Sequence, residues 1–285
     1  MNIVLLTEHK LSDHGIESSK VNAEMMLTDI LDCQRVDLYT EERTLSGEEL
    51  ARLENMISRR IGGEPLQYIL GKTQFYGNDF LVEPGVLIPR PETELLVETV
   101  LNLMKRYEIL DTRYEPSVLD LCAGSGNIAI SLTKALTHCK IMGSDISKKA
   151  IEVAGKNAVR NMVEDRVSFV EADLFDLPAD NKFDVIVSNP PYLTADMMKQ
   201  LPKEVMAEPL TALYGDTDGL YFYSRIAQEA PSYLKSEGFV ACEISPEISG
   251  PVKALFSDSP DFTDVQICKD YNDLDRVITA KKRLS

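Results

Sequence analysis

The stretch Phe183-Asp184-Val185-Ile186-Val187-Ser188-Asn189-Pro190-Pro191-Tyr192 decides the fold of this chain. Residues 183–188 are mostly apolar, which predicts a short buried strand. The strand has to end at Asn189, because proline has no N–H, fixes its φ angle and pushes the preceding residue into an extended conformation. A plain loop breaker is one interpretation of Asn-Pro. A second motif upstream, described below, favours a functional interpretation.

The four residues after this strand carry the groups that hold a planar NH2 group. The side-chain carbonyl of Asn189 and the main-chain carbonyl of Pro190 are two acceptors for its two hydrogens, and the two prolines bring no competing N–H. The ring of Tyr192 can pack against the plane of the bound group. We therefore predict that Asn189, Pro190 and Tyr192 are catalytic and that Asn189, Pro190, Pro191 and Tyr192 bind a substrate whose amide or amine nitrogen accepts a methyl group.

The upstream motif is the glycine-rich turn Asp120-Leu121-Cys122-Ala123-Gly124-Ser125-Gly126, which follows an apolar run and precedes a helix-like segment. The first strand-to-helix turn of a parallel sheet is where the backbone approaches a bound ligand, and glycine permits this approach. The dinucleotide pattern G-x-G-x-x-G is absent, because Asn-Ile-Ala follows Gly126. A pyrophosphate cradle is therefore the weaker interpretation of this turn.

Acidic residues at the ends of the next two strands complete the predicted cofactor site. Asp145 lies about 20 residues beyond the turn, where its two oxygens can accept hydrogen bonds from ribose hydroxyls. The alternative is that Asp145 caps a helix beginning at Ser147. Asp173 and Leu174 are predicted to meet the edge and face of an adenine ring. A ligand with ribose and adenine but without pyrophosphate, serving an NH2 acceptor, indicates S-adenosylmethionine.

The composition limits the partners and the surroundings of the protein. The chain has 285 residues and a net charge of −16, which suits a cationic cofactor and disfavours stable nucleic-acid binding. Five scattered cysteines without a C-x-x-C pair argue against disulfide bonds and a metal site. Without a signal peptide or an apolar run of about 18 residues, we expect a cytoplasmic monomer that does not bind membranes.

Three regions follow one another along the chain. Residues 1–74 are predicted to be helical, with Val21, Met25 and Ile30 on one apolar stripe and a capping box at Ser46 and Glu49. Residues 75–90 are predicted to form a β-hairpin linker around Gly77-Asn78. Residues 91–285 alternate between strands and helices, which predicts a parallel sheet covered on both faces. The expected strands are 118–122, 141–145, 167–171, 183–188, 239–244, 265–268 and 276–280, and the expected helices include 91–107, 127–136, 147–161 and 219–234.

Several segments closely resemble the HemK/PrmC family of peptide chain release factor N5-glutamine methyltransferases. The most discriminating segment is Val86-Leu87-Ile88-Pro89-Arg90-Pro91-Glu92-Thr93-Glu94, preceded by Gly63-Glu64-Pro65-Leu66-Gln67-Tyr68-Ile69-Leu70-Gly71 and Phe75-Tyr76-Gly77. The resemblance extends through Asn-Pro-Pro-Tyr, Glu208-Pro209-Leu210 and Asp275-Arg276-Val277, so it covers essentially the whole chain.

The resemblance implies an α/β class I S-adenosylmethionine-dependent methyltransferase fold: a Rossmann-like, seven-stranded, mostly parallel sheet with a reversed last strand. It further implies that the helical domain of residues 1–74 recognises the substrate, and that residues 91–285 form the methyltransferase domain. The implied substrate is the glutamine in the Gly-Gly-Gln motif of class I release factors, which act in translation termination. The implied cofactor contacts are Cys122, Ala123, Gly124, Ser125, Gly126, Asp145, Asp173, Leu174 and Asn189, with Glu92 and Thr93 near the methionine end.

The sequence departs from the family pattern at three positions. Cys122 stands where the first glycine of the turn is expected, Ser245 replaces the glycine of Glu-Ile-Gly, and Leu174 replaces an aromatic residue. These departures affect the strength of cofactor binding. Two alternatives remain open: an amino-methyltransferase that flips adenine out of DNA or RNA, and a non-catalytic adapter. The acidity of the chain argues against the first, and the intact pair of motifs argues against the second.

Overall fold

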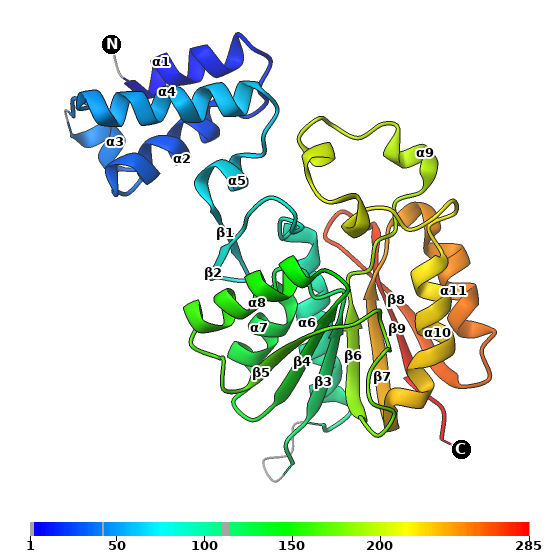
Figure 1. Cartoon of the computed structure of the whole chain (residues 1–285). Helices are drawn as coiled ribbons and strands as arrows, with labels where there is room; N and C mark the ends of the chain where they lie inside the picture. Colours follow the sequence, from blue (N-terminus) through cyan, green and yellow to red (C-terminus); the bar gives the residue numbers. More distant parts are fainter. Residues whose placement is uncertain (1–2, 42, 110–113, 285) are drawn as a thin grey trace. The chain divides into compact units, whose positions relative to one another are not determined.

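The computed structural model describes residues 3–41, 43–109 and 114–284. The chain forms two compact units (Figure 1). One unit comprises Met1–Lys72 together with the later segment Pro202–Ala207, and the other comprises Thr73–Leu201 and Glu208–Ser285. The segment Pro202–Ala207 therefore groups with the helices, although it lies within the sequence range 91–285.

The first unit is helical. Its elements are α1 (Ile3–Ser12), α2 (Ser19–Leu31), α3 (Asp37–Thr40), α4 (Gly47–Ile61), α5 (Leu66–Leu70) and a 3-10 turn at Val205–Ala207. The predicted capping box is confirmed, because Ser46 Oγ accepts from the Glu49 N–H and the Glu49 carboxylate accepts from the Ser46 N–H. An ion pair of 2.5 Å between Arg60 and Glu204 holds the late segment within this unit.

The predicted apolar stripe of the second helix was wrong at two of its three positions. Val21 and Met25 are exposed, whereas Ile30 is buried together with Ala23, Met26 and Leu27. Both stripes have helical spacing, since residues three or four apart share a face of a helix. The structure buries the stripe that faces α1 and α4 in the apolar cluster of this unit.

A β-hairpin connects the helices to the sheet. It consists of β1 (Lys72–Phe75) and β2 (Asn78–Leu81). The prediction of a hairpin is confirmed, but its strands span residues 72–81 rather than 75–90, so residues 72–74 are not helical. Its turn lies at Tyr76-Gly77 rather than at Gly77-Asn78. Both turn residues have positive φ angles, 49° and 69°, as a two-residue type I′ turn requires. The Asn78 side chain donates to the Tyr76 carbonyl oxygen over 2.9 Å and so stabilises the turn from the first position of β2.

The second unit is built on a seven-stranded sheet with the strand order β5-β4-β3-β6-β7-β9-β8. The strands are β3 (Ser117–Leu121), β4 (Lys140–Asp145), β5 (Val167–Glu171), β6 (Phe183–Ser188), β7 (Leu234–Glu243), β8 (Phe262–Lys269) and β9 (Asp275–Lys282). Strands β3 to β7 pair in parallel, and β9 is antiparallel to both of its neighbours. The predicted reversed last strand is therefore confirmed.

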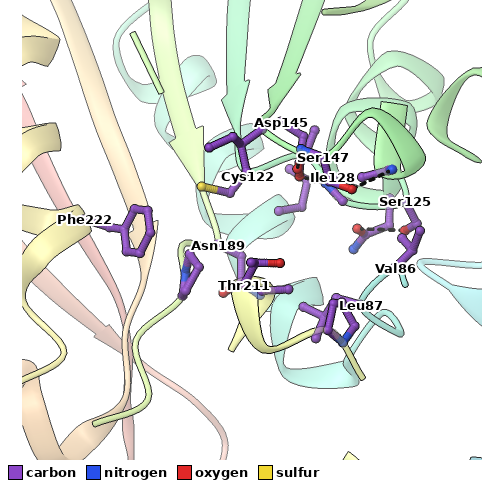
Figure 2. A pocket seen from close by; sticks show the side chains of 18 of the residues that line it. Val86, Leu87, Cys122, Ser125, Ile128, Asp145, Ser147, Asn189, Thr211 and Phe222 are labelled. Atoms are coloured by element: carbon purple, nitrogen blue, oxygen red, sulfur yellow. Dashed lines mark hydrogen bonds between the residues drawn. The ribbon is translucent and has the colours of Figure 1, made fainter. Parts of the chain in front are cut away.

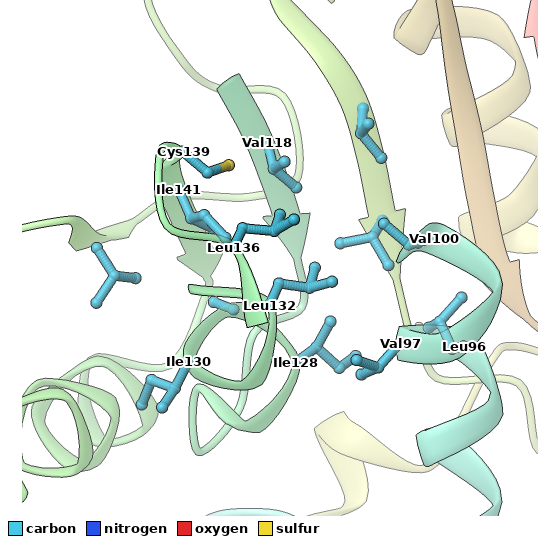
Figure 3. Close-up of a cluster of buried hydrophobic side chains, with 14 of the residues drawn as sticks. Leu96, Val97, Val100, Val118, Ile128, Ile130, Leu132, Leu136, Cys139 and Ile141 are labelled. Atoms are coloured by element: carbon cyan, nitrogen blue, oxygen red, sulfur yellow. The ribbon is translucent and has the colours of Figure 1, made fainter. Parts of the chain in front are cut away.

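Helices cover both faces of this sheet (Figure 1). They are α6 (Glu94–Arg106), α7 (Asn127–Ala135), α8 (Lys148–Arg160), α10 (Tyr221–Tyr233) and α11 (Ser249–Ser257), with the short α9 (Ala195–Met198) and 3-10 turns at Pro91–Thr93, Leu210–Ala212 and Pro246–Ile248. Alternate residues of each central strand supply two apolar cores, because successive side chains of a strand point to opposite faces. Val185 and Val187 belong to the core formed with α6 and α7, and Ile186 belongs to the core formed with α10 and α11. Figure 3 shows Val97 and Val100 of α6 near Ile128 of α7 in the first of these cores.

Candidate active site

The site lies where the strand order of the sheet reverses. From β3 the chain continues through α7 to β4 on one side, while β6 pairs with the other side of β3. Ligands of open parallel sheets bind in the crevice at such a switch point, beyond the carboxyl ends of the strands. Leu121 and Ser188 are register partners at the ends of β3 and β6. The two motifs that follow them therefore begin side by side.

A cavity of about 450 Å³ opens at these strand ends (Figure 2). Its walls come from both motifs, from the segment before α6 and from the loop before α10. The predicted site residues that line it are Cys122, Ala123, Gly124, Ser125, Asp145, Asp173, Leu174, Asn189 and Pro191. The predicted residues Gly126, Pro190 and Tyr192 are not among its lining residues, and neither is Glu92, whereas Thr93 is.

The glycine turn has a left-handed backbone at three positions. The φ angles of Cys122, Gly124 and Gly126 are 59°, 54° and 79°. A Cβ atom at Gly124 would have no neighbour closer than 4.0 Å, so its free side faces the cavity. A Cβ atom at Gly126 would lie 2.8 Å from Phe169 Cζ, so this glycine is required by packing between helix and strand. Cys122, in the left-handed region without being glycine, bears a strain of roughly 1–2 kcal/mol.

Asp145 holds the turn through both of its carboxylate oxygens. Oδ2 accepts from the Gly124 N–H and Oδ1 accepts from the Ser147 N–H, each over 2.8 Å. Burial raises the pKa of this carboxyl above its usual value, and the two N–H donors offset only part of this rise. The N-cap of α8 is Ser147, whose hydroxyl accepts from the Ala150 N–H. Each carboxylate oxygen of Asp145 can accept a further hydrogen bond on the cavity side.

Asp173 and Leu174 differ in their surroundings although they are neighbours. Asp173 is half exposed and forms an ion pair of 2.8 Å with Arg225, a residue of α10 that the sequence did not single out. Leu174 is buried, has a φ angle of 48° and packs into the core between the sheet and α10. One wall of the cavity is therefore apolar at Leu174 and charged at its edge.

Asn189 stands at the point where β6 ends. Its Nδ2 donates to Thr93 Oγ1 over 3.1 Å, and Thr93 is almost fully buried at the start of α6. This hydrogen bond leaves the carbonyl oxygen Oδ1 of Asn189 as the acceptor that the side chain can offer to a ligand. Pro191 lies in the cavity wall, and Tyr192 packs against the apolar core next to α10.

The loop before α10 packs directly against the backbone of Asn-Pro-Pro-Tyr. Leu193 N–H donates to the Leu213 carbonyl, and Gly215 N–H donates to the Leu193 carbonyl. A Cβ atom at Gly215 would lie 2.6 Å from Tyr192 Cα, and one at Gly219 would lie 2.5 Å from Tyr192 O. Only glycine fits at these two positions, so they fix the place of the loop.

A buried acid ties the same loop to the segment before α6. The Glu208 carboxylate accepts from the Ile88 N–H over 3.0 Å and pairs with Arg90. Both connected segments line the cavity. The residues of this part of the cavity wall are far apart along the chain, so no sequence pattern within one element predicts it. Only the resemblance to the family singled out the two segments that form it. The lining residues that neither motif indicates include Leu210, Thr211, Ala212, Tyr214, Tyr221 and Phe222.

Two kinds of feature are absent from the described ranges 3–41, 43–109 and 114–284. Within them no helix is long and apolar enough to cross a bilayer. The same residues contain no group of three or more His, Cys, Asp or Glu placed to hold a metal ion.

The sheet order, the glycine turn and the site at its switch point define a methyltransferase of the class I fold. A methyltransferase from Pyrococcus furiosus shares this fold with a TM-score of 0.52 and 17% identity, over 84% of this chain and 100% of that chain. Two family models match the sequence: the PrmC N-terminal domain over residues 4–71, and the methyltransferase small domain over residues 93–219.

Comparison with full-length relatives gives the family. The release factor glutamine methyltransferase of Fusobacterium nucleatum is 39% identical over 278 residues, which are 96% of this chain and 76% of that protein. The protein of the same name from Geobacter sulfurreducens is 39% identical over 277 residues, which are 96% of this chain and 94% of that protein. The chain belongs to the PrmC/HemK family of release factor glutamine methyltransferases.

Proposed function

We propose that this chain transfers a methyl group from S-adenosylmethionine to the side-chain amide nitrogen of the glutamine in the Gly-Gly-Gln motif of class I release factors. The observation that carries the proposal is the position of Asn189. Its NH2 group is engaged by Thr93, and it lies in the wall of the same cavity as Asp145 and the glycine turn. A carbonyl acceptor is thus available next to a site suited to a nucleoside.

The cavity fits the proposed cofactor in size and in the chemistry of its walls. Its volume lies within the range of about 300–1,000 Å³ that is usual for small-molecule sites. Asp145 retains acceptor capacity for ribose hydroxyls, Leu174 offers an apolar surface to adenine, and the open side of Gly124 allows close approach. When bound there, S-adenosylmethionine supplies an electrophilic methyl group on a sulfonium.

The residues of the chain contribute position rather than covalent chemistry. An amide nitrogen is a poor nucleophile, because its lone pair is delocalised into the carbonyl group. Asn189 Oδ1 and the Pro190 carbonyl are proposed to hold the two amide hydrogens and so to orient the nitrogen, and Tyr192 to support the plane of the amide. Correct orientation alone can lower a barrier by several kcal/mol. Of these three residues, Asn189 is the one that lines the cavity.

The helical unit is proposed to recognise the release factor. Large apolar side chains on its helices are exposed, and such side chains bind another protein where they form one patch. They are Leu5, Leu6, Val21, Met25, Tyr39 and Leu50. The sheet unit contains the whole cavity, so the proposal assigns recognition and methyl transfer to different units.

The test combines the purified protein with labelled S-adenosylmethionine and one of four acceptors. These are a class I release factor, the same factor with Gly-Gly-Gln changed to Gly-Gly-Ala, double-stranded DNA and a structured RNA. We expect label only in the unchanged release factor, on the glutamine side chain. Label in DNA or RNA alone would replace the proposal with adenine methylation, and equal label in both release factors would place the acceptor elsewhere.

A further inference from the structure

Glu243 is a buried acid that the proposed mechanism does not yet use. It is the last residue of β7, and its preceding residue, Cys242, is the register partner of Ser188 on β6. The residues that follow Ser188 and Cys242 are Asn189 and Glu243. Because the strands run in parallel, their ends bring the acid next to the asparagine of the site.

The Glu243 carboxyl is enclosed and incompletely paired. The residue is 4% exposed, and its Oε2 has no hydrogen-bond partner among the residues that the structure describes. Hydrogen bonding from the side chains of Thr93 and Asn189 lowers the pKa of this carboxyl, so both side chains lie next to it. An isolated buried carboxylate is costly, so a position like this calls for an explanation beyond packing.

The hydrogen bonds around this carboxyl run in one direction. Asn189 Nδ2 donates to Thr93 Oγ1 over 3.1 Å, and the Thr93 hydroxyl therefore keeps its own hydrogen for another acceptor. An ionised carboxylate can only accept. With Glu243 ionised, the chain of donors therefore runs from Asn189 through Thr93 to Glu243.

We propose that ionised Glu243 is a positioning residue that fixes the side-chain amide of Asn189, through Thr93, with its carbonyl oxygen available to the substrate amide. This inference rests on the proposed function, because it needs a substrate that donates hydrogens to Asn189. Glu243 itself does not line the cavity. It acts by stabilising one of the two orientations of the Asn189 side-chain amide over the other.

Protonation of Glu243 would reverse this arrangement. A neutral carboxyl carries a hydrogen that it can donate to Thr93 or to Asn189, so the amide can turn and present its NH2 group to the substrate NH2 group. Burial raises the pKa of Glu243 to about 7; the Thr93 hydroxyl lowers it, Glu92 raises it, and Arg276 and the Asn189 side chain lower it. The tyrosines next to this acid, Tyr192 and Tyr223, have pKa values raised mainly by burial, so they stay neutral in this range.

The reaction rate should therefore depend on pH through Glu243. A group that must be ionised makes the rate rise with pH through its pKa. The test is single-turnover methyl transfer to whole release factor at saturating S-adenosylmethionine, from about pH 5.5 to 9. We expect the wild-type rate to rise with a midpoint near pH 7, and the Glu243→Gln rate to be at least about tenfold lower at pH 8 and flat across this midpoint.

Two controls separate positioning from stability. Asp184→Asn removes another buried acid of the same sheet, at the opposite end of β6, and should keep the wild-type pH profile. Binding of S-adenosylmethionine to Glu243→Gln should change by less than about threefold, which is below 1 kcal/mol. A Glu243→Gln enzyme with the wild-type rate and profile would overturn the inference.

The Thr93 pair tests the same relay without changing the acid. Thr93→Ser keeps the hydroxyl and should retain the rate at pH 8 and the pH profile, whereas Thr93→Val keeps the shape and should lose both. Equal rates for the two variants would contradict the relay, even if Glu243→Gln fails to fold. Absence of transfer by the wild-type protein itself would instead count against the proposed function, so the two failures are distinguishable.

Discussion

Ser188 and Leu121 are register partners on adjacent parallel strands, and the Ser188 hydroxyl donates to the Leu121 carbonyl oxygen over 2.8 Å. This buried hydrogen bond connects the last residues of the two strands that precede the glycine turn and Asn-Pro-Pro-Tyr. A shift of one strand along the other would separate the two motifs. The relationship therefore sets the distance between the proposed nucleoside site and Asn189.

Asp145→Ala should weaken S-adenosylmethionine binding at least about tenfold, because charge-assisted hydrogen bonds contribute roughly 1.5–3 kcal/mol each. It should also lower the melting temperature, since the Gly124 and Ser147 N–H groups lose their acceptor. Calorimetric titration measures the affinity, and thermal unfolding measures the stability. The control is Asp165→Ala, an exposed acid outside the cavity. A reduced melting temperature with an unchanged dissociation constant would leave Asp145 with a structural role alone.

Asn189→Ala should reduce single-turnover transfer at least about a hundredfold, as removal of a positioned catalytic hydrogen bond does. The melting temperature should stay near that of the wild type, because the side chain has few partners: it donates to Thr93 and lies next to Glu243. Asn189→Asp keeps the shape but adds a charge and removes the NH2 donor. The control is Asn181→Ala, before the opposite end of β6. Transfer by Asn189→Ala at the wild-type rate would mean that Asn-Pro-Pro-Tyr only terminates the strand.

Gly215→Ala and Gly219→Ala should lower both stability and transfer. Each new Cβ atom would meet the Tyr192 backbone at 2.6 Å or less, so the loop or Asn-Pro-Pro-Tyr has to move. The matched control is Gly155→Ala, in the middle of α8, where a Cβ atom meets nothing within 4 Å. It should raise stability by about 0.5–1 kcal/mol. Chemical unfolding and transfer assays compare the three variants. Equal stability and equal transfer rates in all three would refute the close packing of Gly215 and Gly219 against the Tyr192 backbone.

Asp120→Asn should flatten the dependence of stability on pH. Burial raises the pKa of Asp120 to about 8, so between about pH 4 and 8 the folded state keeps a proton that the unfolded state releases. The free energy of unfolding of the wild type therefore falls as pH rises through this window. The variant has no such proton. The free energy of unfolding of the variant minus that of the wild type should therefore increase from pH 5 to 8. Urea unfolding at both values measures the difference; a constant difference would contradict the raised pKa.

Local sequence predicted some elements to the residue. The strands Val167–Glu171 and Phe183–Ser188 occur as expected, because each is a compact apolar run with a clear end. The buried face of α2 was not predictable in the same way, since two overlapping apolar stripes both satisfy helical spacing. The packing of neighbouring helices decides between such stripes, and no local pattern contains it.

The candidate site was predictable where a single motif indicates it and not where several segments converge. Gly124, Asp145 and Asn189 follow from strand ends, and the structure places all three at one cavity. The contact of Glu243 with Thr93 and Asn189 depends on the order of the strands in the sheet. Likewise, Glu208 reaches Ile88 across 120 residues of sequence. Such pairings follow from topology, which a single sequence does not display.

The grouping of Pro202–Ala207 with the N-terminal helices bears on how the protein folds during synthesis. The helices end by Lys72, so the ribosome adds 135 residues (207 − 72) before this unit has all its parts. At about 5–20 residues per second this takes roughly 7–27 s. During that interval Arg60 lacks Glu204, its ion-pair partner. We expect nascent chains arrested before residue 202 to expose the helical unit to proteases more than chains arrested well beyond residue 207.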